Sequence, residues 1–188
     1  AKANGIDMDK IKVEPVGFPT REPMLAEGKV DSVTGFSFSS YLNLVRLGVP
    51  EDDITTILMA DHGLQLYGNA VIANTDFAKS NPDIVKKFLS AVGSGWKDAI
   101  KSPKTAAAAL VKRNPAADAA LEQRRLQLAI NANVLTDYVK ANGMGRIDKD
   151  RFALAIKQLG ETYDYKTAPD AKLYFTGAYL PDEGILLQ

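Results

Sequence analysis

Small hydroxyl residues and phenylalanines gather at two places where an apolar stretch gives way to a helical pattern. The first is VGFPTR at residues 16–21, and the second is TGFSFSS at residues 34–40. In each, a glycine lets backbone N–H groups face a ligand, a phenylalanine offers an apolar surface, and hydroxyl groups can donate or accept hydrogen bonds. These groups suit the binding of a small polar molecule at helix N-termini. Ordinary helix capping with core phenylalanines explains the same residues, and the pattern alone leaves both interpretations open.

Arg21 is the cationic side chain nearest to these turns in the sequence. A guanidinium group can hold a carboxylate, sulfonate or phosphate through two parallel hydrogen bonds. The alternative is a surface arginine in the first turn of a helix, neutralised by the neighbouring Glu22.

A third polar cluster lies in ADHGLQLYGNA at residues 60–70. His62 could titrate near neutral pH, or it could hold a loop together through Asp61. Tyr67 and Asn69 add a ring and an amide group. With the two turns, this cluster completes the set of candidate ligand-binding residues. They are Phe18, Thr20, Arg21, Thr34, Gly35, Phe36, Ser37, His62, Tyr67 and Asn69.

The composition of the 188 residues argues against several classes of function. Lys and Arg together number 23, as do Asp and Glu, so no basic field is available to attract nucleic acid. The chain has no cysteine and one histidine, which disfavours metal sites and a Ser-His-Asp triad. We therefore expect no metal, no cofactor, no nucleic-acid partner and no catalytic residue.

The elements that must position the candidate residues alternate between strand and helix patterns in the first 74 residues. Thr20 is expected to cap the first of these helices, and Ser39 and Ser40 the second. Strands are expected at 11–16, 30–36, 54–60 and 67–74, and helices at 19–29 and 39–49. Later helices are expected to begin at Pro82, at Pro103, over 116–143 and after Asp148. This order predicts an α/β fold with at least some parallel strands.

Four stretches, in this order, resemble the substrate-binding proteins of ABC importers, in the branch for nitrate, sulfonates, taurine and thiamine-pyrimidine precursors. They are EGKVDSVTGFSFSSYLNLVRLGV, YGNAVIANTDFAKSNPDIVKKFLSAVGSGWKDAIKSPKTAAAAL, GRIDKDRFALAI and LYFTGAYLPDEG. The resemblance implies a type II periplasmic binding fold, of which this sequence would hold only part. It also implies that the turn at Thr34, Gly35, Phe36 and Ser37 faces the ligand.

The same resemblance implies a division of the chain and a function. Residues 1–66 would form the later part of lobe two, and residues 67–188 the return crossing and the helices that pack on both lobes, with the N-terminal lobe missing. The expected protein is a periplasmic or lipid-anchored solute receptor that delivers a small polar or anionic solute to a membrane permease. It would be a monomer at full length. The alternatives are an enzyme relative in thiamine-pyrimidine biosynthesis and the effector domain of a transcription regulator.

Overall fold

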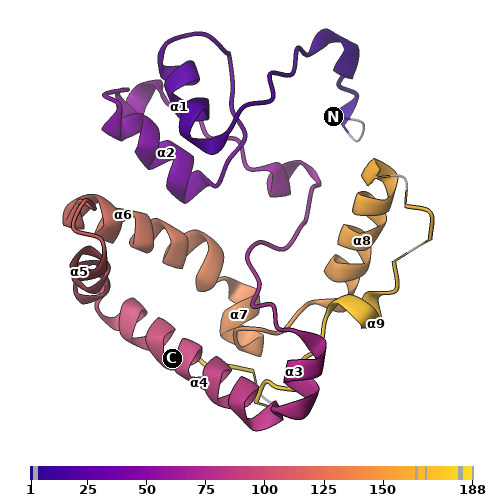
Figure 1. Cartoon of the computed structure of the whole chain (residues 1–188). Helices are drawn as coiled ribbons and strands as arrows, with labels where there is room; N and C mark the ends of the chain where they lie inside the picture. The colour runs from indigo at the N-terminus through magenta and orange to yellow at the C-terminus, as the bar shows by residue number, and fades with distance from the viewer. Residues whose placement is uncertain (2–3, 164, 168, 182–183, 188) are drawn as a thin grey trace. The chain divides into compact units, whose positions relative to one another are not determined.

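The computed structural model describes residues 1, 4–163, 165–167, 169–181 and 184–187. These residues form a mostly helical chain that divides into two compact units, Ala1–Leu64 and Gln65–Gln188 (Figure 1). Within the described ranges, no helix has both the length and the apolar character that crossing a bilayer requires.

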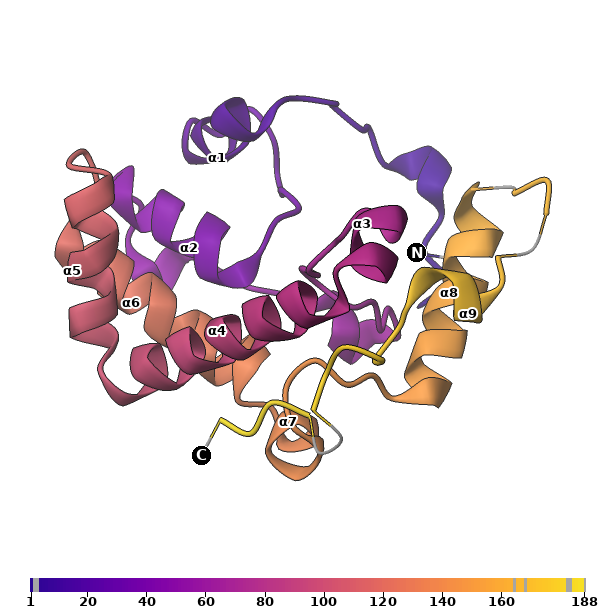
Figure 2. The same cartoon turned by 60° about the horizontal axis from the view of Figure 1, so that its bottom comes forward.

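The first unit is organised around two helices, α1 (Phe18–Ala26) and α2 (Ser37–Arg46), which pack against each other (Figure 2). Leu42 and Leu44 of α2 are buried, as are Glu22 of α1 and Ser40 of α2. Three short 3-10 helices complete the unit. They are η2 (Met8–Lys10), η3 (Glu51–Asp53) and η4 (Met59–His62).

The second unit is a succession of helices in which α4, α5 and α6 pack in sequence order. Its core contains small and aliphatic side chains, among them Ala107, Ile130 and Ala155. The elements are α3 (Thr75–Ser80), α4 (Pro82–Lys101), α5 (Pro103–Arg113), α6 (Ala119–Ala129), the π-helix η5 (Ile130–Val134), α7 (Asp137–Asn142), α8 (Lys149–Tyr163) and α9 (Ala171–Tyr174).

Local signals located several helix starts correctly. Helices α4 and α5 begin at Pro82 and Pro103, as predicted, and Asp148 accepts a hydrogen bond from the backbone N–H of Arg151 at the start of α8. The single long helix expected over 116–143 is wrong. The Thr136 side chain accepts a hydrogen bond from the N–H of Val139 and so caps a new helix, α7, which is separate from α6.

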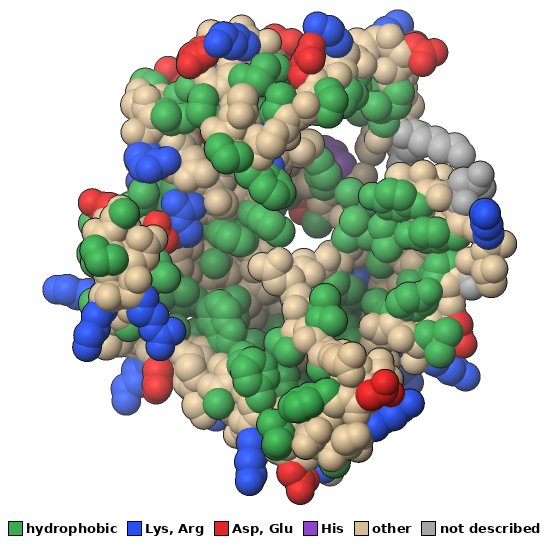
Figure 3. Space-filling model, viewed as in Figure 1, with side chains coloured by type: hydrophobic (Ala, Val, Ile, Leu, Met, Phe, Trp, Pro, Cys, Tyr) green, Lys and Arg blue, Asp and Glu red, His purple; other side chains and the backbone are tan. Residues whose placement is uncertain are grey.

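The predicted α/β architecture of the type II periplasmic binding fold is also wrong for the structure. Among the described residues, none of the four segments expected as strands pairs with another strand. The one isolated β-bridge in the described ranges is antiparallel and joins Met144 to Ile185. The segments are irregular, apart from Met59 and Ala60, which belong to η4. A sheet needs hydrogen-bonding partners from other strands, and alternation in sequence does not supply them. Many of their apolar residues are consequently exposed, with Ile72 at 91%, and hydrophobic side chains are visible at the surface in Figure 3.

The C-terminal segment is held in the second unit by close backbone packing. Met144 and Ile185 exchange two backbone hydrogen bonds of 2.9 and 3.0 Å. The Ile185 side chain packs against the buried Gly93 of α4, so closely that a Cβ atom at position 93 would collide with Ile185 Cγ2. Glycine at this position therefore lets the C-terminal segment lie directly on α4.

Gly93→Ala should lower the free energy of unfolding by about 1–3 kcal/mol, because the added methyl group must displace Ile185. Gly95→Ala is the matched control, since nothing lies within 4 Å of its added Cβ in the same helix. The control should be neutral or stabilising by up to about 1 kcal/mol, from helix propensity alone. Denaturant unfolding followed by circular dichroism measures both, and equal stability of the two variants would contradict the proposed packing.

Candidate functional site

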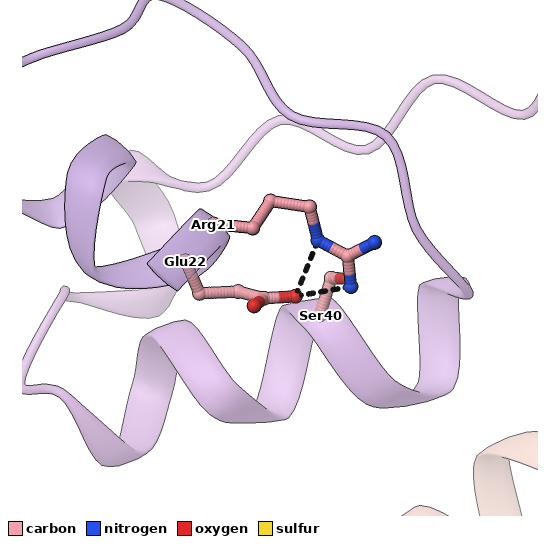
Figure 4. Close-up of polar contacts among 3 residues, drawn as sticks. All are labelled: Arg21, Glu22 and Ser40. Carbon is pink, nitrogen blue, oxygen red and sulfur yellow. Dashed lines mark hydrogen bonds and ion pairs between the residues drawn. The ribbon is translucent and has the colours of Figure 1, made fainter. Parts of the chain in front are cut away.

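The first turns of α1 and α2 meet through the side chain of Arg21. Its Nη2 donates to Ser40 Oγ at 3.2 Å, which links the two helices. The same guanidinium group donates to Glu22 Oε1 from Nη2 at 2.7 Å and from Nε at 3.2 Å (Figure 4). Two turns that the sequence analysis singled out separately are thus joined by one side chain.

Glu22 is the buried member of this group, with 3% of its surface exposed. Burial alone would raise the pKa of its carboxyl group, since a carboxylate loses hydration in the interior. Hydrogen bonds from Ser40 and Arg21, and the positive charge of Arg21, outweigh that effect and hold the pKa of Glu22 below its ordinary value. The lowered pKa favours the charged carboxylate, which pairs with the guanidinium group of Arg21.

Phe18 and Gly35 border the guanidinium group. The Cζ atom of Arg21 lies 5.2 Å from the centre of the Phe18 ring, which is 79% exposed. A Cβ atom at Gly35 would collide with Ser40 Oγ and lie 3.0 Å from Arg21 Nη2. The loop can therefore pass this close to Arg21 only because residue 35 has no side chain.

Phe36 is the N-cap of α2, and Ser37 is its first residue. The Phe36 ring is 53% exposed and stacks on Phe38 at a centroid distance of 5.4 Å. Thr34 precedes them in the exposed loop, and Thr20 lies within the first turn of α1. These residues adjoin the Arg21 group along the chain and present an aromatic ring and hydroxyl groups beside it.

The capping roles expected for Thr20, Ser39 and Ser40 are wrong. Helix α1 starts after Gly17 and α2 after Phe36, and neither N-cap side chain makes a capping hydrogen bond. Phe18 is the first residue of α1, and Phe36 directly precedes α2. Both helices therefore begin earlier than the positions of the hydroxyl residues suggested. Ser40 consequently lies within α2, on its buried face.

His62 makes no hydrogen bond or ion pair with the Arg21 group among the described residues of the first unit. His62 ends η4, and its backbone oxygen accepts from Asn4 Nδ2 at 3.0 Å. Tyr67 and Asn69 belong to the second unit, where Asn69 is exposed and Tyr67 contacts α8. Their predicted role at a ligand remains a prediction.

Ser40 is the site residue that the sequence analysis misassigned. The sequence could have indicated its burial, because Ser40 lies four residues before the apolar Leu44. This spacing places both residues on the buried face of α2, where a hydroxyl group needs a polar partner. Within the described ranges, no group of three or more acidic or histidine side chains is arranged to hold a metal ion. The arrangement therefore offers hydrogen-bond donors and aromatic surface.

The charge of Glu22 should make the stability of the protein depend on pH. Because the folded-state pKa lies below the ordinary value of 4.5, the stabilisation is present above pH 4.5 and is lost as pH falls through the folded-state pKa. Glu22→Gln should lose about 1–3 kcal/mol at neutral pH, since it leaves Arg21 without its anion, and should unfold with a weaker dependence on acid. The melting temperature from pH 3 to 7 measures this.

Glu27→Gln is the control for this series, because Glu27 is exposed and pairs with the exposed Lys29. It should follow the wild-type pH dependence with little change in stability. A Glu22→Gln protein whose melting temperature parallels that of wild type across the whole range would show that this carboxylate is not the charged, paired group described above.

Comparison with known proteins gives one family. The model of the family described as NMT1/THI5 like matches residues 1–106, which include α1, α2 and every candidate site residue. Comparisons with curated proteins and with solved structures gave no match. The matched region covers more than half of the 188 residues, and the chain belongs to the NMT1/THI5-like family.

Proposed function

We propose that the chain is the solute-binding component of an ABC importer and that it binds a small polar or anionic solute at the starts of α1 and α2. The observation that carries the proposal is the Arg21–Ser40 hydrogen bond, which brings together the two turns that were candidates on sequence grounds. Membership of the NMT1/THI5-like family supports a solute-binding function or one related to thiamine precursors.

The chemistry of the Arg21 group suits oxygen atoms of a small solute. Nε and Nη2 of Arg21 are engaged by Glu22 and Ser40, whereas no described residue accepts a hydrogen bond from Nη1. Nη1 therefore keeps two N–H groups for a ligand. The positive ends of the α1 and α2 dipoles lie at the same turns and favour an acceptor or an anion there.

The pairing with Glu22 limits how much negative charge this group can hold. The Arg21–Glu22 pair is close to neutral as a whole, so it provides directed N–H donors with little net positive field. The exposed rings of Phe18 and Phe36 add apolar surface on either side of the donors along the chain. This combination supports a nitrate, a sulfonate or a pyrimidine-like solute over a multiply charged phosphate.

We propose binding rather than catalysis. The chain has no cysteine and one histidine, and His62 makes no described contact with the Arg21 group. Ser40 does have a carboxylate neighbour, but the lowered pKa of Glu22 makes that carboxylate a weak base for activating a hydroxyl group. In the proposed role, the loaded protein is periplasmic or lipid-anchored and hands its solute to a membrane permease.

The proposal predicts that nitrate, taurine or a thiamine-pyrimidine precursor raises the melting temperature of the protein. A solute at about 100 times its Kd stabilises the folded state by about 2.7 kcal/mol. Phe36→Ala and Ser37→Ala should weaken binding of the best solute by about tenfold or more. Their melting temperatures without solute should change little, because both side chains lie at the surface end of α2.

Phe77→Ala is the matched control, since Phe77 is similarly exposed and lies in α3 of the second unit. Isothermal titration calorimetry gives the Kd of each variant. A solute that stabilises wild type but binds Phe36→Ala and Ser37→Ala with unchanged affinity would place the site elsewhere. Turnover of a pyrimidine precursor by wild type would favour the enzyme alternative over the receptor.

A further inference from the structure

Tyr67 is bound through its hydroxyl group to the backbone of Asp148, 81 residues further along the chain. The N–H of Asp148 donates to Tyr67 Oη at 2.8 Å, and Oη lies 3.4 Å from the carbonyl oxygen of Asp148. The Asp148 carboxylate accepts from the N–H of Arg151 at 2.8 Å and so caps α8. Tyr67 is thus attached to the N-terminal end of α8.

Arg151, one turn into α8, holds the same short segment from its own side chain. Its Cζ atom lies 4.8 Å from the centre of the Tyr67 ring, within the range of a cation–π contact. Its Nη2 donates to the carbonyl oxygen of Leu66 at 3.0 Å, and its Nε to that of Gln65 at 3.4 Å. One side chain therefore contacts three consecutive residues.

Aromatic packing adds to these polar contacts. The Phe152 ring meets the Tyr67 ring edge-on at 6.2 Å between centroids. Phe175 meets Phe152 in the same way at 6.1 Å. Residues 65–67 are therefore held to α8 by hydrogen bonds, by a cation–π contact and by aromatic contacts at once.

The chain immediately before this segment is held by the first unit. The N–H of Leu64 donates to the carbonyl oxygen of Met59 at 3.0 Å, across the turn that Gly63 makes with a φ of +92°. The carbonyl oxygen of His62 accepts from Asn4 Nδ2. Contacts within the first unit thus reach as far as Leu64, and contacts within the second begin at Gln65.

We propose that Tyr67, Asp148 and Arg151 form a clasp that keeps the backbone of residues 65–67 rigid on the N-terminal end of α8. In this role Tyr67 is a positioning residue. None of these contacts involves Arg21, Glu22 or Ser40, so this inference holds or fails independently of the proposed function.

The test uses the full chain without solute, in nitrogen-15 relaxation and amide-exchange measurements by NMR. Residues 65–67 of wild type should show the order parameters of rigid backbone, about 0.85. Arg151→Ala should lower them below about 0.6, as in a flexible loop. Tyr67→Phe should speed exchange of the Asp148 amide about tenfold, because only the Tyr67 hydroxyl accepts from it among the described residues.

Arg151→Lys separates charge from geometry, since lysine keeps the charge but cannot reproduce the stacked, forked contacts of the guanidinium group. It should behave like Arg151→Ala. Tyr174→Phe, at an exposed tyrosine of α9, is the control and should leave both measurements unchanged. Order parameters below about 0.6 for residues 65–67 in wild type, or Asp148 exchange that is unaffected by Tyr67→Phe, would overturn the proposal.

Discussion

The candidate site depends on one interaction, the ion pair between Arg21 and the buried Glu22 that also reaches Ser40. A carboxylate with so little exposed surface is tolerated only when donors replace the water it has lost. Arg21 provides two of those donors and is held in place by doing so. The missing side chain at Gly35 leaves room for this guanidinium group and for Ser40, and the Phe18 ring lies over the same group.

The pair also decides what kind of binding the first unit can offer. An unpaired arginine would attract anions mainly by charge, whereas a paired one offers directed hydrogen bonds of fixed geometry. The buried Glu22 carboxylate fixes this geometry. The free donors are the N–H groups of Nη1, on the other side of the same guanidinium group (Figure 4). We therefore regard Glu22 as the residue that orients Arg21 for a solute.

The sequence predicted those parts of the structure that depend on neighbouring residues. The helix starts at Pro82 and Pro103 were correct because proline and the residue before it act within one turn. The sheet was wrong because strand pairing depends on partners distant in sequence, which alternation at 11–16 or 54–60 cannot specify. The turns at Phe18 and Phe36 were found from their residue types, but the Arg21–Ser40 contact was not, because it forms only when α1 and α2 pack together.

The central claim is that a solute binds at the joined starts of α1 and α2. Its most direct test is a titration of the nitrogen-15-labelled chain with the solute that stabilises it most, followed by backbone amide and arginine side-chain resonances. We expect the largest shifts at Gly35, Phe36 and Ser37 and at the Arg21 guanidinium group. The largest shifts at α4 or α8, with the Arg21 resonances unmoved, would contradict it.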